Sequence, residues 1–107
     1  DDMLIIRGVN VFPTQVEELI TKQPKLSPHY VLEVRREGRL DELAVIVEIR
    51  QDLAAVPASE RDAEARQLEH HIKSYIGVSS DVKVVEPGKV ERSQGKAKRV
   101  IDLRPKG

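Results

Sequence analysis

Two alternating runs in the middle of the chain constrain its fold more than any other feature. Apolar residues occupy every second position between residues 29 and 36, and the same period returns between residues 43 and 49. A period of two places the apolar side chains of a strand on one face. The link between the runs is short and contains Gly38, which is typical of a β-hairpin. The pattern predicts an antiparallel hairpin with one apolar face that needs a cover.

Two helical patterns can supply that cover. The first runs to about Lys22, with apolar residues at i, i+3 and i+4 and capping-box spacing over residues 14–17. Pro13 is predicted to lie just outside this helix or at its first position. The second is predicted to begin at a cap on Ser59 and to stop before Gly77. Its apolar stripe consists of Ala65, Leu68, Ile72, Tyr75 and Ile76.

Shorter apolar runs complete the predicted architecture. Residues 3–6 and 9–11 read as two short strands around a turn at Gly8, and residues 82–85 read as a last strand. Residues 99–103 are compatible with a terminal strand or with one helical turn. We therefore predict an α+β fold: a small ferredoxin-like sheet, built from an N-terminal β-hairpin and then αββαβ, with two helices on one face and a C-terminal loop that carries a lysine.

Length and charge limit the function. The 107 residues form one predicted domain, 1–107, and Lys+Arg 18 balances Asp+Glu 18, so no global field points to nucleic acid or membrane. Residues 88–107 hold seven cations against two acids, which places any handling of anions there. The lack of cysteine, of a signal peptide and of a long apolar run favours a cytoplasmic protein. The abrupt start in an apolar run suggests a piece of a longer protein.

Few residues offer catalytic or metal-binding patterns. The histidines are His29, His70 and His71, and the adjacent pair would point about 100° apart on a helix, so no metal site is expected. Lys96 follows a glycine, but the next residue is Ala97 and no second glycine precedes at the right distance. A Walker P-loop is therefore excluded.

The basic stretch of residues 92–99 is polar, contains one glycine and lacks apolar periodicity. It is predicted to be an exposed loop. Its composition is compatible with a frayed basic tail. It is equally compatible with a lysine that is carried into a site built elsewhere, and composition alone does not decide between the two.

Two motifs at opposite ends of the chain add a resemblance. Residues 1–8 (DDMLIIRG) and 92–102 (RSQGKAKRVID) are similar to the hinge and the closing lysine motif in C-terminal domains of adenylate-forming enzymes, in the branch of phenylacetate–coenzyme A ligases. Glu91 stands where that branch usually has proline, and the Gly-Arg that precedes the hinge is absent. The resemblance covers essentially the whole chain.

That resemblance implies the mobile C-terminal domain of an acid–thiol ligase. Such enzymes join an aryl acid to AMP from ATP and then transfer the acyl group to coenzyme A. Lys96 would be the catalytic lysine of adenylation, because its ammonium offsets the repulsion between a carboxylate and a phosphate. Gly95 and Arg99 would support the loop around it.

The resemblance also implies roles for the start of the chain and for a missing domain. Asp1, or Asp2 beside it, would be the hinge, and the Gly8 hairpin would line the coenzyme A channel. ATP, Mg²⁺ and coenzyme A would be bound mainly by an N-terminal domain, so the fragment alone is expected to be inactive. Self-association stays open.

Two other functions remain as alternatives. A regulatory ferredoxin-like domain would bind a small molecule at a helix–strand turn or at a dimer interface, but it leaves the basic tail unexplained. An RNA-binding domain needs exposed aromatic residues on strands for base stacking. The chain offers only Phe12, Tyr30 and Tyr75, which disfavours that function.

Overall fold

The computed structural model describes residues 3–91 and 99–105. In chain order the elements are β1 (Leu4–Ile6), β2 (Val9–Val11), α1 (Pro13–Thr21), β3 (Leu26–Glu37), β4 (Leu40–Ile49), a 3₁₀ turn η1 (Gln51–Leu53), α2 (Ala58–Tyr75), β5 (Ser80–Val85) and β6 (Val100–Asp102). The predicted α+β class and the order of the elements are confirmed. For residues 99–103, the strand was the correct alternative.

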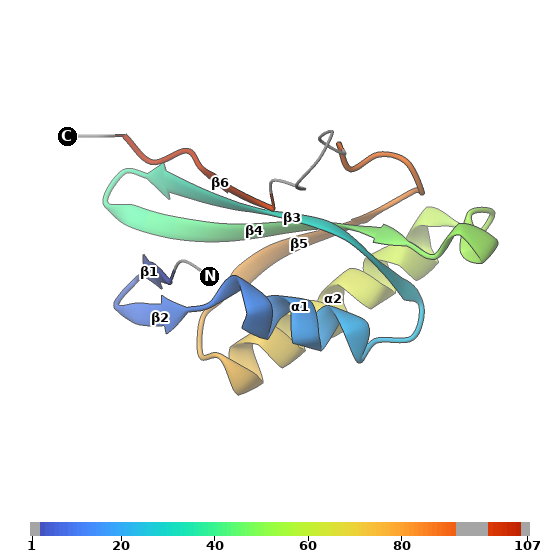
Figure 1. Cartoon of the computed structure of the whole chain (residues 1–107), viewed down its shortest axis with the longest axis horizontal. Helices are drawn as coiled ribbons and strands as arrows, with labels where there is room; N and C mark the ends of the chain where they lie inside the picture. The colour runs from blue at the N-terminus through green and yellow to red at the C-terminus, as the bar shows by residue number, and fades with distance from the viewer. Residues whose placement is uncertain (1–2, 92–98, 106–107) are drawn as a thin grey trace.

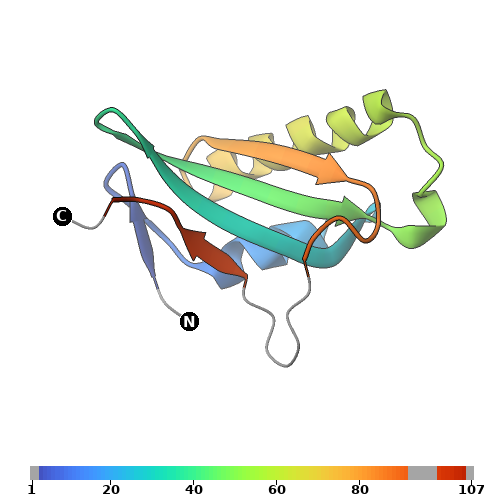
Figure 2. The same cartoon turned by 90° about the horizontal axis from the view of Figure 1, so that it is seen from above.

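The main sheet has four strands in the order β5-β4-β3-β6. β3 and β4 pair antiparallel, with Leu32 opposite Val45, while β6 runs parallel to β3 and β5 parallel to β4. β1 and β2 form a separate two-stranded sheet. Both helices cover one face of the main sheet, and β6 lies at its edge (Figures 1 and 2). Within residues 3–91 and 99–105 no helix lies on the other face, which we call the face without helices (Figure 1).

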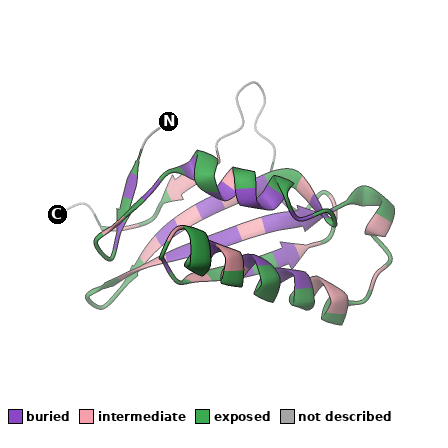
Figure 3. Ribbon diagram, turned by 90° about the horizontal axis from the view of Figure 1, so that it is seen from below, coloured by how far each residue is buried: buried purple, intermediate pink, exposed green. Residues whose placement is uncertain are grey.

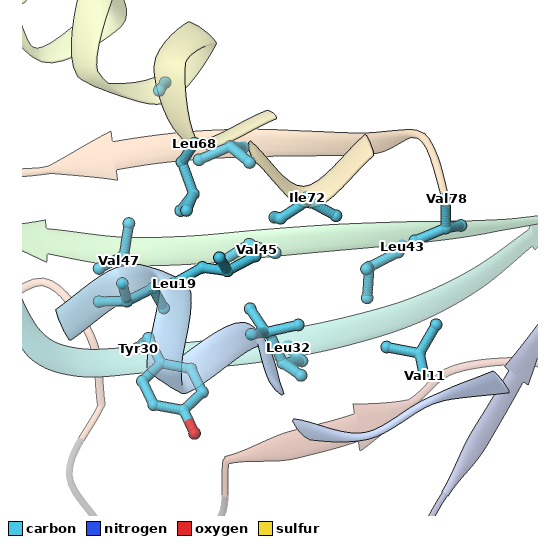
Figure 4. Close-up of a cluster of buried hydrophobic side chains, with 14 of the residues drawn as sticks. Val11, Leu19, Tyr30, Leu32, Leu43, Val45, Val47, Leu68, Ile72 and Val78 are labelled. Carbon is cyan, nitrogen blue, oxygen red and sulfur yellow. The ribbon is translucent and has the colours of Figure 1, made fainter. Parts of the chain in front are cut away.

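The core lies between the helices and the covered face of the sheet. Leu32 and Leu43 from the sheet and Leu68 and Ile72 from α2 are almost fully buried, and their side chains meet in this layer (Figure 4). The buried positions of strands and helices accordingly face one another (Figure 3). Full burial of a leucine side chain contributes about 2 kcal/mol, so this layer is the main source of stability.

The start of α1 confirms one part of the prediction and corrects another. Pro13 is the first helical residue, one of its two predicted positions, but Phe12 is the N-cap, so the predicted cap over residues 14–17 is wrong. The Gln15 N–H donates to the Phe12 carbonyl (2.9 Å), and the Phe12 N–H donates to the Gln15 side-chain oxygen (3.1 Å). Proline favours the first helical position because it has no N–H to leave unpaired there. Glu17 is thereby free of a capping role.

The end of α2 corrects a second expectation. Tyr75 was placed in the buried stripe but is 75% exposed, whereas the next residue, Ile76, packs against the core as predicted. The Tyr75 ring lies edge-on to His71 instead, with centroids 6.3 Å apart. The helix begins at Ala58, one residue before the predicted cap at Ser59. The stop at Gly77 is confirmed by its left-handed φ of 93°.

β3 is longer than predicted, since it begins at Leu26 rather than at residue 29. Its register with β4 shifts between Leu26 and Tyr30, around Pro28, which has no N–H for the ladder. The alternation used for the prediction therefore holds only after this irregularity. From Tyr30 onward the predicted face is buried as expected.

Candidate functional site

Several of the predicted site residues lie outside the described part of the chain. These are Lys96 and Gly95 in the segment of residues 92–98, and Asp1 and Asp2 at the start. Their proposed roles are therefore untested by the structure. The candidate site is built from the described residues on either side of the 92–98 segment and from the hairpin at Gly8.

The first anchor of this segment consists of Val90 and Glu48. The Val90 N–H donates to Glu48 Oε2 at 3.0 Å, and both residues are buried. Glu48 lies on β4 between Val47 and Ile49, whose side chains belong to the core. Its carboxylate therefore points to the face without helices, over which the chain passes after β5 (Figure 1). A buried carboxylate needs such donors to offset its lost hydration.

The second anchor consists of Arg99, Tyr30 and Glu17. The Arg99 guanidinium lies over the Tyr30 ring, 5.0 Å from its centroid, and donates through Nη1 to Glu17 Oε1 on α1. The Arg99 carbonyl accepts from the Leu32 N–H at 2.7 Å. Tyr30 first, and Glu17 after it, raise the pKa of Arg99 above its ordinary value. The predicted supporting residue Arg99 is thus tied to both α1 and β3.

A shallow cleft on the face without helices adjoins the first anchor, whereas the second anchor lies on the side of α1, where Tyr30 belongs to the core. The volume of the cleft is about 370 Å³, with Val31 and Ile46 as an apolar floor, Val90 and Glu91 on one side and Ile101 of β6 on another. The residues that flank positions 92–98 are held on two neighbouring strands, Val90 on β4 through Glu48 and Arg99 on β3 through Leu32.

The turn between β1 and β2 is where the sequence placed it. Arg7 and Gly8 both have positive φ, 51° and 76°, and open space surrounds the position of a Cβ at Gly8. Within this domain, glycine is favoured there by its backbone conformation rather than by crowding. The proposed approach of Gly8 to another domain is not tested by the chain on its own.

An arginine cluster ties the residues after β6 to this hairpin. Arg104 Nη1 donates to the Ile5 carbonyl (3.0 Å) and to Asp41 Oδ2 (2.9 Å), and Nη2 donates to Asp102 Oδ2 (2.8 Å). The side chain and then the backbone of Arg104 lower the pKa of Asp102 to about 2. Arg36 first, and Arg104 after it, lower the pKa of Asp41.

Three anchoring residues were missed from the sequence: Glu17, Tyr30 and Glu48. Glu17 was assigned to a helix cap, and Tyr30 to the apolar face of a strand. Glu48 offered the one usable signal, because it is a charged residue inside a strand whose neighbours on both sides are apolar.

Within residues 3–91 and 99–105, no group of three or more His, Cys, Asp or Glu residues could hold a metal ion. Nor is any helix there long and apolar enough to cross a membrane.

Comparison with known sequences gives consistent relatives over nearly the whole chain. The family of AMP-binding enzyme C-terminal domains matches residues 8–104. A phenylacetate-coenzyme A ligase from Aromatoleum evansii is 56% identical over 108 residues, which is 99% of this chain and 24% of that protein. The Escherichia coli K12 phenylacetate-coenzyme A ligase is 55% identical over 104 residues, 97% of this chain and 24% of its own. The chain thus spans about a quarter of the length of these relatives.

Comparison with solved structures leads to the same kind of protein as comparison with known sequences. A domain of phenylacetate-coenzyme A ligase from Bacteroides vulgatus superposes with a TM-score of 0.87 at 33% identity, covering 98% of this chain and 95% of that one. A 2-hydroxyisobutyryl-CoA ligase with 2-HIB-AMP and CoA, in its thioesterification state, gives a TM-score of 0.86 at 30% identity. The match covers 97% of this chain and 22% of that protein.

Proposed function

The chain belongs to the family of AMP-binding enzyme C-terminal domains, and from this premise we propose that it is the C-terminal domain of a phenylacetate–coenzyme A ligase. The reaction joins phenylacetate, ATP and coenzyme A to give phenylacetyl-coenzyme A, AMP and diphosphate. The observation that carries the proposal is the 56% identity with such a ligase over 99% of the chain. No comparison supports the regulatory small-molecule-binding alternative.

Lys96 is the residue we assign to adenylation. The acid carboxylate must approach the α-phosphate of ATP, and these two anions repel. An ammonium group between them offsets the repulsion and stabilises the charge that develops in the transition state. The two anchors support this role, because Val90 and Arg99 fix both ends of the segment that contains Lys96.

The other roles need the remainder of the enzyme. An N-terminal domain is proposed to hold the aryl acid, ATP with its Mg²⁺, and most of coenzyme A, in the cytoplasm where both cosubstrates are available. Asp1, or Asp2, is proposed as the hinge about which the present domain turns between the two half-reactions. The Gly8 hairpin would then face the coenzyme A channel, where a bare backbone permits close approach.

The decisive experiment compares the two half-reactions in the full-length ligase that carries this domain. Lys96→Ala should slow ATP–diphosphate exchange with phenylacetate by about a hundredfold or more, the loss typical for removal of one transition-state donor. Transfer of coenzyme A to preformed phenylacetyl-adenylate should fall far less. Lys98→Ala removes a neighbouring charge and is the matched control. Equal losses in the two half-reactions of Lys96→Ala would contradict the assigned role.

A further inference from the structure

The β1–β2 hairpin is fixed by apolar contacts on its inner face only. Among the described residues, β1 and β2 pair with each other and with no strand of the main sheet. Leu4 and Ile6 of β1 are buried in the core, while Ile5 between them is 53% exposed. The tip of the hairpin, Arg7 and Gly8, is exposed and has no buried side chain. The orientation of the tip therefore depends on polar contacts.

Those polar contacts converge on Asp41, near the start of β4. The β1–β2 turn and the β3–β4 turn lie at the same end of the molecule (Figures 1 and 2). Arg36 Nε donates to Asp41 Oδ1 at 2.7 Å, and Arg104 Nη1 donates to Asp41 Oδ2 at 2.9 Å. Arg7 Nε, at the hairpin tip, donates to the Asp41 backbone carbonyl at 2.7 Å. One residue thus accepts hydrogen bonds from three separate parts of the chain: the hairpin, β3 and the residues after β6.

Arg104 makes a second connection to the hairpin. The Nη1 group that meets Asp41 also donates to the Ile5 carbonyl of β1 at 3.0 Å. The Nε and Nη2 groups of Arg104 donate to the two carboxylate oxygens of Asp102, which orients the plane of the guanidinium. The hairpin is therefore bound to the main sheet at its tip, through Arg7, and in the middle of β1, through Ile5. Both connections pass through Asp41.

The contacts at Asp41 are of a kind that fixes geometry. Hydrogen bonds between guanidinium and carboxylate groups are charge-assisted and directional. An isolated ion pair at the surface contributes little, but several charges that share one acceptor form a network. The Asp41 side chain is 14% exposed, and Arg36 and Arg104 approach different oxygens of its carboxylate. The carboxylate cannot rotate without breaking one of these bonds.

We propose that Asp41 is a positioning residue for acyl transfer to coenzyme A: it holds the β1–β2 hairpin in one orientation to the main sheet, without touching either substrate. This rests on the proposed function, which places the Gly8 hairpin beside the coenzyme A channel. The thiol must approach the acyl carbon in a narrow geometry, and a displacement of about 1 Å can slow such a step by about a hundredfold. Neither anchor of the 92–98 segment includes Asp41, so adenylation by Lys96 should not depend on it.

The isolated chain tests the positioning without turnover. It has its own core, and a solved structure of which this fold covers 95% is a single domain of a related ligase. In Asp41→Asn an amide N–H replaces one acceptor oxygen, so one guanidinium loses its partner, while the backbone carbonyl used by Arg7 remains. Backbone amides of β1 and β2 should exchange about tenfold faster, as expected for the loss of one hydrogen bond to a charged group. The Leu32 amide of the main sheet should keep its exchange rate.

The full-length ligase tests the consequence for the reaction. Asp41→Asn should slow transfer from preformed phenylacetyl-adenylate by about tenfold at saturating coenzyme A, and should leave ATP–diphosphate exchange within about twofold. Asp41→Glu keeps the carboxylate and should recover part of the transfer rate. The matched control is Asp52→Asn, which breaks a 2.7 Å ion pair with Arg50 beyond the other end of β4. It should leave both half-reactions within about twofold.

A second variant approaches the same contact from its partner. Arg104→Gln should separate the two half-reactions in the same way, and Asp41→Asn combined with Arg104→Gln should be little slower than either alone, because both remove one shared interaction. Should Asp41→Asn fail to fold, Arg104→Gln decides.

Unchanged exchange of the hairpin amides overturns the proposal. Equal losses in the two half-reactions, or a rise confined to the KM for coenzyme A, overturn it as well, because the first indicates a purely structural role and the second a binding role. A failure of the ligase assignment is seen separately, as a wild-type enzyme that transfers nothing to coenzyme A, while the exchange measurement still reports on Asp41.

Discussion

The two anchors of the 92–98 segment hold the chain in different ways. At the first anchor, a backbone N–H of Val90 donates to the carboxylate of Glu48, which is 1% exposed. At the second, the side chains of Arg99 and Glu17 pair while each remains more than a third exposed. The first contact is a buried hydrogen bond to a charge, and the second is an ion pair in contact with water.

This difference implies unequal strength. Loss of a buried acceptor exposes the full cost of an unpaired polar group, whereas exposed ion pairs contribute 1 kcal/mol or less as a rule. We infer that the contact at Val90 is firm and that the side-chain contact of Arg99 is adjustable, although the Arg99 carbonyl stays paired with the Leu32 N–H. Such an arrangement suits a lysine that must be presented in one half-reaction and withdrawn in the next.

Removal of Glu48 should have the largest effect on stability. Glu48→Ala leaves the Val90 N–H without its acceptor in a buried place, so the free energy of unfolding should fall by about 2 kcal/mol. Glu48→Gln keeps an acceptor oxygen and should lose less than half of that. Urea unfolding of the isolated chain measures both values.

Hydrogen exchange makes the same comparison locally. In Glu48→Ala the Val90 amide should exchange faster, while the Leu32 amide, which donates to the Arg99 carbonyl, should keep its protection. A free energy of unfolding for Glu48→Ala within about 0.5 kcal/mol of the wild type would mean that the first anchor is no stronger than an ordinary surface contact.

The sequence predicted the local features well and missed the anchors. The alternation in β3 and β4 and the stripe at Ala65, Leu68 and Ile72 record burial directly, and the structure confirms them. The Tyr75 error shows the limit of that signal, because helical periodicity does not fix how wide a stripe the core covers: Ile76 packs against it while Tyr75 is exposed.

The anchors are long-range contacts, which periodicity does not encode. Glu48 is 42 residues from Val90, and Glu17 is 82 residues from Arg99. An acid on the polar face of α1 looks the same whether it meets water or an arginine from the other end of the chain. For Lys96 and the hinge, it was the two motifs at the ends of the sequence that suggested a role, and the experiments above are needed to test it.

Loss of Glu17 should have a smaller effect than loss of Glu48, and one visible mainly in activity. In the full-length ligase, Glu17→Gln should slow adenylation by about twofold to fivefold, the range for a partly exposed ion pair. It should leave transfer from preformed adenylate unchanged, because the pair acts on the segment that carries Lys96.

The matched control for Glu17→Gln is Glu18→Gln, which breaks an exposed pair with Lys22 on the same helix. A purely structural role for Glu17 would lower the rates of both half-reactions equally, and that outcome would remove the functional distinction between the two anchors.

Tyr30→Phe keeps the aromatic ring under Arg99, whereas Tyr30→Leu removes it. The adenylation rate of Tyr30→Phe should therefore be closer to that of the wild type than the rate of Tyr30→Leu is.

The smallest effect is expected in the arginine cluster at the end of β6, where Asp102 pairs with Arg104. The pKa of Asp102 is lowered from 3.8 to about 2 by Arg104. A carboxyl with a depressed pKa in the folded state stabilises that state fully above its ordinary pKa, and the contribution is lost as the pH falls toward the folded value. The free energy of unfolding of the isolated chain should therefore decrease between about pH 4 and pH 2, and Asp102→Asn should make that decrease shallower while having little effect on the slope near neutral pH. Because the pair is exposed to solvent, the difference should be small and should shrink further in high salt.

Carboxyl NMR titration of Asp102 provides the direct measurement. Parallel curves for wild type and Asp102→Asn, together with an ordinary pKa for Asp102, would show that the Asp102–Arg104 pair does not stabilise the folded chain measurably.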